Sequence, residues 1–173
     1  MINKKNAELI KLVATDIDGV WTDSKMYYTN AGDFMKAFST YDGMAVQLLN
    51  EINIPVAILT SEDSTIVKQR AKKLKIKNVY TNEKEKLSRL KYLCNKYNIK
   101  LQNVAYIGDD LNDLEVLKEV GISAMPSSSP ILNLFKSDYV TKAKGGEGAF
   151  REFADLIIKH HKWFYILYIL KNK

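Results

Sequence analysis

The chain has 173 residues, 46% of them hydrophobic, which suits one compact domain with a sizeable core. Its net charge of +6 would suit a nucleic-acid partner, but much of the excess lies in two lysine-rich stretches, 68–77 and 84–100, where apolar residues recur at helical spacing. This spacing indicates amphipathic helices with solvated basic faces. We therefore expect no nucleic-acid partner, although a basic surface would still attract an anionic substrate.

The predicted elements alternate between short apolar runs and segments of helical periodicity. In chain order they are strand 9–15, helix 43–51, strand 56–60, helix 65–74, strand 78–80, helix 84–97, strand 104–108, helix 111–120, strand 122–124, strand 139–140 and helix 149–160. This alternation predicts a mainly parallel sheet between helical layers, a three-layer α/β sandwich of the Rossmann type. Ligands of such a sheet bind at the carboxyl ends of its strands.

Residues 25–39 break the alternation and predict a β-hairpin that projects from the sheet. Large apolar side chains alternate along it, at Met26, Tyr28, Phe34 and Phe38. No inserted segment is long enough for a cap domain. An apolar arm that leaves the body favours contact with a partner subunit, so we expect a homo-oligomer.

The sequence as a whole predicts a single domain over residues 1–173, with a core at about 9–158 and an apolar tail at 159–173. The apolar run 163–170 is too short to cross a bilayer, and we expect it to pack on its own or a neighbouring subunit rather than on a membrane. A single cysteine and no apolar stretch of signal-peptide length before the first strand predict a cytoplasmic protein.

Asp16 and Asp18 follow the first predicted strand and are the most informative residues of the chain. Carboxylates two residues apart at a strand end lie on one side, where they can share a divalent cation and a phosphate. One Asp can attack phosphorus while the other handles the proton of the leaving oxygen. This pattern predicts a phosphatase, although Asp and Gly also suit a simple turn.

Thr60 and Lys86 supply groups that suit a phosphoryl anion. Thr60 ends the second core strand just before a helix, where a hydroxyl and the helix N-terminus can bind a phosphoryl oxygen. Lys86 lies near a helix start, a position that the helix dipole makes unfavourable for a cation unless an anion is nearby. The alternatives are a helix cap for Thr60 and a solvated side chain for Lys86.

Two further segments complete the candidate site. Asp109, Asp110 and Asp113 are mutually repelling carboxylates at a strand end, which favours a bound hard cation over helix capping alone. Mg²⁺ needs only one or two protein carboxylates, so Asp16 and Asp109 would suffice, with Asp110 or Asp113 supporting them from behind. The glycine-rich turn at Gly145 and Gly146 either connects flexibly or lets backbone amides approach an anion.

Taken in order, these segments resemble the four motifs of the haloacid dehalogenase superfamily of phosphohydrolases, over about residues 9–158. The matching residues are Asp16-x-Asp18-Gly19-Val20, Thr60, Lys86 and Gly108-Asp109-Asp110-x-Asn112-Asp113. The hairpin, the glycine-rich segment 145–151 and the missing cap are similar to the capless branch that acts on 3-deoxy-manno-octulosonate 8-phosphate and nononate 9-phosphates. That branch forms tetramers whose hairpins contact neighbouring subunits, which the resemblance implies here.

The resemblance also implies a role for each matching residue. Asp16 would be the nucleophile and a Mg²⁺ ligand, and Asp18 the general acid and base that also offers its backbone carbonyl to the metal. Asp109 would complete the protein ligands. Thr60 and Lys86 would hold the phosphoryl group and offset its charge.

The leading substrate expectation is a nonulosonate 9-phosphate of the sialic acid type. Octulosonate 8-phosphatases commonly show Thr-Gly-Arg where this chain has Thr60-Ser61-Glu62, and the nononate enzymes tend to show Thr-Gly-Glu. Glu62 would accept sugar hydroxyls beside Ser61, and Arg70 and Lys73, which share a helix face, would bind the substrate carboxylate, make a subunit contact or be solvated.

Two alternatives stay open at this point. The first is octulosonate 8-phosphate as the substrate of the same chemistry. The second is a non-catalytic oligomerisation module of sialate or nononate activation, which would use the hairpin and the apolar tail. Asp18, Lys86 and Asp109 argue against the second, because a pure scaffold has no need of repelling carboxylates.

Overall fold

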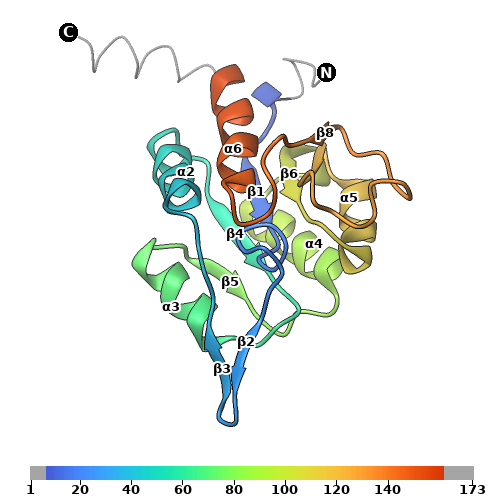
Figure 1. Ribbon diagram of the computed structural model, residues 1–173. Helices are drawn as coiled ribbons and strands as arrows, with labels where there is room; N and C mark the ends of the chain where they lie inside the picture. The colour runs from blue at the N-terminus through green and yellow to red at the C-terminus, as the bar shows by residue number, and fades with distance from the viewer. Residues whose placement is uncertain (1–6, 162–173) are drawn as a thin grey trace, which may run out of the picture.

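The computed structural model describes residues 7–161, which form strands and helices in regular alternation (Figure 1). The elements are β1 Leu12–Thr15, β2 Tyr27–Thr29, β3 Gly32–Met35, α2 Thr40–Glu51, β4 Val56–Leu59, α3 Thr65–Lys73, β5 Asn78–Tyr80, α4 Lys86–Tyr97, the 3₁₀ turn η1 Leu101–Asn103, β6 Val104–Ile107, the 3₁₀ turn η2 Leu111–Asp113, α5 Leu114–Glu119, β7 Ile122–Met125, β8 Tyr139–Val140 and α6 Ala149–His160.

A parallel sheet of six strands, in the order β5-β4-β1-β6-β7-β8, forms the centre of the fold. From β1 the chain first builds outward through β4 and β5, and β6 then returns to the other side of β1. The strand order therefore reverses beside β1. In open α/β sheets, the ligand crevice lies at this reversal, outside the carboxyl ends of the strands.

Both faces of the sheet are covered, so every residue of β1, β4, β6 and β7 is buried. Side chains such as Val13 join those of α2, α3 and α6 in one hydrophobic cluster. Side chains such as Leu12 join those of α4 and α5 in a second cluster. The predicted three-layer α/β sandwich with a parallel sheet is confirmed.

The three largest differences between predicted and observed element boundaries have local reasons. The first strand begins at Leu12 rather than residue 9, because Ala7 and Glu8 are helical and the Ile10 N–H closes a turn on the Ala7 carbonyl. The first long helix begins three residues early, at Thr40, because the Ser39 hydroxyl caps it. The predicted helix 111–120 is divided into η2 and α5, because Asp110 and Asp113 form a reciprocal capping box at its start.

The predicted hairpin is present as β2 and β3, which form a small antiparallel sheet that projects from the body (Figure 1). Tyr28 and Phe34 are 61% and 67% exposed, whereas Phe38 packs against the core at the hairpin base. Within residues 7–161, no helix has the length and apolar character needed to cross a bilayer. The predicted apolar run 163–170 lies outside the described residues.

Candidate active site

A cavity of about 420 Å³ opens at the carboxyl ends of β1, β4 and β6. Asp16 follows β1, Thr60 follows β4 and Asp109 follows β6 after one glycine. The lining residues are Asp16, Asp18, Ser24, Met26, Thr60, Ser61, Glu62, Asp109, Asp110, Leu111 and Asn112. The structure thus brings together, at the strand reversal, segments that lie more than 90 residues apart in the chain.

Asp16 is buried at the base of this cavity, with an exposed fraction of 4%. Its Oδ2 lies 3.1 Å from Lys86 Nζ, and its buried Oδ1 has no hydrogen-bond partner among the described residues. Burial, reinforced by the neighbouring Asp113 carboxylate and opposed by Lys86, raises the pKa of Asp16 to about 7. An oxygen left unpaired at this depth is available to a ligand.

Asp113 organises the cluster from behind the cavity. Its Oδ1 accepts hydrogen bonds from Lys86 Nζ at 2.7 Å and from the Tyr106 hydroxyl at 2.5 Å. Its Oδ2 accepts from the backbone amides of Asp109 at 2.9 Å and Asp110 at 3.3 Å. With both oxygens engaged, Asp113 fixes Lys86 and the Asp109 backbone rather than facing the cavity.

Asp109 is the second buried carboxylate that lines the cavity. Burial and repulsion from Asp16 and Asp113 raise its pKa to about 8. Ser129 Oγ donates a hydrogen bond of 2.6 Å to the Asp109 carbonyl and holds its backbone. Hydrogen bonds to its backbone therefore hold Asp109 in place, while the carboxylates of Asp16 and Asp113 repel its side chain.

These carboxylates suit a hard divalent cation. One oxygen from each of Asp16, Asp109 and Asp113 lies within 4.8 Å of the others. Because Asp113 is fully hydrogen-bonded, Asp16 and Asp109 are the two that remain for a metal, which matches the one or two carboxylates that Mg²⁺ takes. A bound cation would also offset the burial and the repulsion that raise both pKa values.

Asp18 is held by a residue that sequence reasoning missed. Lys36 Nζ lies 2.5 Å from Asp18 Oδ1, and Thr22 Oγ1 donates to the same oxygen at 3.2 Å. The sequence offers no local sign of this contact, because Lys36 stands among apolar residues of the hairpin. Tyr106 and Ser129 were missed for a similar reason, since their roles depend on partners brought close only by the fold.

Lys86 and Thr60 both lie where the sequence predicted, at the first residue of α4 and the residue after β4. The attraction of Asp16 and Asp113 outweighs the effect of burial and raises the pKa of Lys86, which therefore stays charged. Thr60 is buried and its hydroxyl accepts a hydrogen bond of 3.4 Å from the Glu62 amide. Lys86 contacts Asp16 but is not part of the cavity lining.

The predicted substrate residues separate into two groups. Ser61 and Glu62 line the cavity, and Ser61 Oγ accepts a hydrogen bond of 3.1 Å from Asn112 Nδ2. Arg70 instead donates to the Ser39 carbonyl at 3.2 Å, and Lys73 is exposed on α3. Arg70 and Lys73 are therefore not brought to the cavity of their own subunit.

The glycine-rich turn supports the site from the side instead of lining it. A Cβ on Gly145 would lie 1.9 Å from the Gly19 carbonyl oxygen, so only glycine permits this approach. The Gly145 amide donates to Ser128 Oγ and the Gly146 amide to the Val20 carbonyl, each at 3.0 Å. Both amides are thus engaged within the protein, which differs from the predicted contact with an anion.

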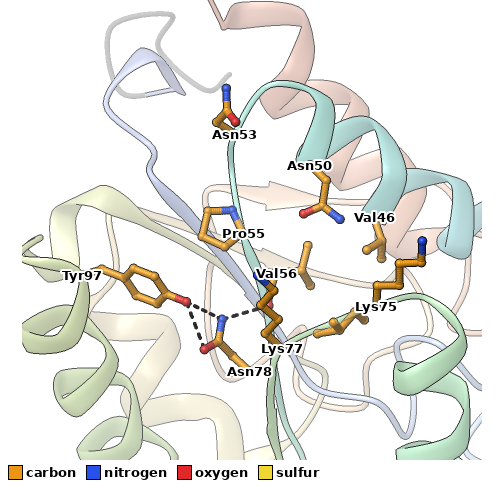
Figure 2. A pocket seen from close by; sticks show the side chains of 10 residues that line it. Val46, Asn50, Asn53, Pro55, Val56, Lys75, Lys77, Asn78 and Tyr97 are labelled. Atoms are coloured by element: carbon orange, nitrogen blue, oxygen red, sulfur yellow. Dashed lines mark hydrogen bonds between the residues drawn. The ribbon is translucent and has the colours of Figure 1, made fainter.

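A second cavity of about 470 Å³ lies at the opposite, amino-terminal end of β4 and β5 (Figure 2). Its polar centre is Asn78, whose side chain shares two hydrogen bonds with the Tyr97 hydroxyl (Figure 2). Lys75 and Lys77 are exposed at its rim, and no carboxylate lines it. It is the larger of the two cavities, but it lacks a nucleophile and a metal ligand.

The buried carboxylates at the strand ends suit hydrolysis of a phosphate ester, and comparison with known proteins identifies a hydrolase family. Residues 57–151 match the model of the haloacid dehalogenase-like hydrolase family. The chain belongs to this family, as the sequence motifs predicted. The predicted phosphatase class is also confirmed, because the similar proteins are phosphatases.

Among its relatives are 3-deoxy-D-manno-octulosonate 8-phosphate phosphatases. The chain is 39% identical to the one from Salmonella typhi over 152 residues, which cover 88% of this chain and 81% of the relative. A solved structure of the enzyme from Moraxella catarrhalis, in complex with magnesium, phosphate and KDO, superposes with a TM-score of 0.90 at 36% identity, covering 98% and 97% of the two chains. The Yersinia pestis enzyme gives 0.89 at 36% identity, covering 94% and 88%.

Proposed function

We propose that this protein is a Mg²⁺-dependent phosphomonoesterase that hydrolyses 3-deoxy-D-manno-octulosonate 8-phosphate. The observation that carries the proposal is the meeting of Asp16, Asp18, Thr60 and Asp109 in one cavity, in a chain that matches phosphatases of this substrate over most of its length. The predicted Mg²⁺ cofactor is supported by the family and by the magnesium in the Moraxella catarrhalis enzyme.

In the proposed reaction, a carboxylate oxygen of Asp16 attacks the phosphorus and forms an aspartyl phosphate. The bond between phosphorus and the sugar oxygen breaks, and Asp18 gives its proton to that oxygen. Asp18 then takes a proton from a water that attacks the same phosphorus, which releases phosphate and restores Asp16. Thr60 would hold the phosphoryl oxygens by hydrogen bonds, and Lys86 would offset their charge through its contact with Asp16.

A magnesium ion would be held by Asp16 and Asp109, with the Asp18 backbone carbonyl as a further ligand. When bound, it supplies positive charge that neutralises the phosphoryl oxygens as the bond to the leaving group breaks. The remaining residues act by position. Asp113 holds Lys86 and the Asp109 backbone, and Ser129 holds the Asp109 carbonyl.

The choice of substrate departs from the leading sequence-based expectation. Glu62 favoured a nonulosonate 9-phosphate, whereas the relatives favour the octulosonate. Glu62 lines the cavity and is exposed, so it can contact a sugar hydroxyl of either acid. Agreement over most of the chain carries more weight than one residue at the rim, and the nonulosonate becomes the second candidate.

Phosphate release with Mg²⁺ from both acids tests this choice. We expect kcat/KM for 3-deoxy-D-manno-octulosonate 8-phosphate to exceed that for a nonulosonate 9-phosphate by at least about tenfold, equivalent to about 1.4 kcal/mol. A preference for the nonulosonate would overturn the substrate but keep the phosphatase. No turnover of any sugar-acid phosphate in the presence of Mg²⁺ would overturn the function itself.

The assembly is a further part of the proposal. The exposed apolar side chains of the hairpin, Met26, Tyr28 and Phe34 among them, support a homotetramer formed through this arm. A monomeric mass at micromolar concentration in light scattering would contradict it. The single-domain organisation and the cytoplasmic location are proposed on the sequence grounds given above.

A further inference from the structure

Lys36 is the one buried residue between positions 23 and 37, the segment that contains the hairpin. It directly follows β3, and its side chain is only 2% exposed. A buried lysine is costly unless a partner compensates its charge. The partner here is Asp18, with Nζ and Oδ1 2.5 Å apart. The hairpin therefore places one cation against Asp18, a residue that lines the cavity.

The two oxygens of Asp18 have unequal surroundings. Oδ1 accepts from Lys36 Nζ and from Thr22 Oγ1, which approach from different parts of the chain. Oδ2 is buried and has no partner within residues 7–161. Two donors on one oxygen restrict rotation of the carboxyl group, and the other oxygen is left free to exchange a proton with a ligand.

We propose that Lys36 is a positioning residue that orients Asp18 for proton transfer to the leaving oxygen. The inference rests on the proposed function, because it assigns Lys36 a purpose only if Asp18 is the general acid. Lys36 does not line the cavity and acts through Asp18. Its position after β3 also makes the orientation of Asp18 depend on the seating of the hairpin.

Substrates with different leaving groups test this role. An alkoxide needs a proton as it leaves, whereas 4-nitrophenolate leaves without one, and kcat/KM reports the steps up to release of the leaving group. We expect Lys36→Met to lower kcat/KM for the sugar-acid phosphate by about 10- to 100-fold and for 4-nitrophenyl phosphate by less than about 3-fold. Lys36→Arg, which keeps a cation, should recover most of the lost activity on the sugar-acid phosphate.

Lys68→Met is the matched control, because Lys68 Nζ also lies 2.5 Å from an aspartate oxygen, that of Asp63, but both side chains are at least half exposed. Lys68→Met should leave kcat/KM unchanged for both the sugar-acid phosphate and 4-nitrophenyl phosphate. Thermal melts establish that each variant is folded, and Lys36→Gln serves as the second variant if Lys36→Met does not fold.

Equal losses on both substrates, or no loss on either, would overturn the positioning role. Asp18→Asn separates the two proposals. If it spares 4-nitrophenyl phosphate but not the sugar-acid phosphate, Asp18 is the general acid and a failure at Lys36 concerns Lys36 alone. If Asp18→Asn shows no dependence on the leaving group, the catalytic role proposed for Asp18 is wrong.

Discussion

The two ends of strand β4 open onto cavities of similar size but opposite character. At the amino end, beside Val56, the buried polar group is Asn78, and both its side-chain nitrogen and oxygen have hydrogen-bond partners. At the carboxyl end, beside Thr60, Asp16 Oδ1 and Asp18 Oδ2 are buried without partners in the described part of the chain. Cavity volume alone would favour the amino end as the active site. Buried carboxylate oxygens without hydrogen-bond partners favour the carboxyl end instead.

The difference follows from how a parallel sheet is built. The carboxyl ends of β1, β4 and β6 meet at one edge, so polar residues placed after each strand converge there. Burial of these converging carboxylates, together with their mutual repulsion, raises the pKa values of Asp16 and Asp109. None of the residues that line the cavity at the amino edge is a carboxylate, and Asn78 links β5 to Tyr97 of α4 by a hydrogen bond.

The largest expected effect comes from removing the nucleophile. Asp16→Asn should lower Mg²⁺-dependent phosphate release by about 10⁴-fold or more, because the amide cannot attack phosphorus. Thermal melting should show a folded protein. Turnover close to that of the wild type would contradict the assignment of the active site to the carboxyl end of the strands, since the reaction would then take place elsewhere.

Lys86→Met should lower both activity and stability. It removes the cation shared by Asp16 and Asp113, and breaking a buried ion pair costs about 3–5 kcal/mol. We expect urea unfolding without Mg²⁺ to show this loss, with an activity loss of about 100-fold or more. Unchanged stability would mean that the ion pairs do not hold the carboxyl edge together.

The carboxyl edge should also make stability depend on pH. The folded pKa values of about 7 for Asp16 and about 8 for Asp109 exceed the unfolded value near 4, so the folded state binds more protons between these limits. Their contribution without metal is therefore fully present below about pH 4 and is lost as the pH rises toward 8. Mg²⁺ needs both groups ionised and should add more stability at about pH 8.5 than at about pH 6.

Melting curves at several pH values, with and without Mg²⁺, measure this dependence. Asn78→Ala is the matched control, because the amino-end cavity holds no carboxylate and its variant should keep the wild-type pH profile. A Mg²⁺ shift of equal size at both pH values would contradict the account.

The smallest effect is expected at the amino edge itself. Asn78→Ala removes the hydrogen bonds to Tyr97 and to the Val56 carbonyl, and should cost about 1–3 kcal/mol in urea unfolding. Phosphate release should stay within about twofold of the wild type, because Asn78 lines the cavity at the opposite strand ends from Asp16. A large activity loss in the folded variant would show that the amino cavity takes part in function.

The fold was predictable because apolar runs and helical periodicity alternate clearly along the chain. The errors are local, and side chains cause two of them: Ser39 begins α2 early, and Asp110 with Asp113 splits the helix after β6. A hydrophobic pattern does not report such caps, which depend on single hydrogen bonds.

The site was predictable where its residues follow strand ends, as Asp16, Thr60 and Asp109 do. It was not predictable where a side chain reaches the site from a separate element. Lys36, which follows the hairpin strand β3, contacts Asp18 and was not predicted. Arg70 was predicted to bind substrate but donates a hydrogen bond to the Ser39 carbonyl. Periodicity places residues on faces, but it does not say which faces meet.

A crystal structure of the wild-type chain with Mg²⁺ and beryllium fluoride, a mimic of a phosphoryl group on aspartate, tests the central claim most directly. We predict the fluoride complex bonded to Asp16, the metal between Asp16 and Asp109, and Thr60 and Lys86 next to the bound group. A site at Asp16 that stays empty, or binding in the cavity around Asn78 instead, would contradict the assignment of the carboxyl edge as the active site.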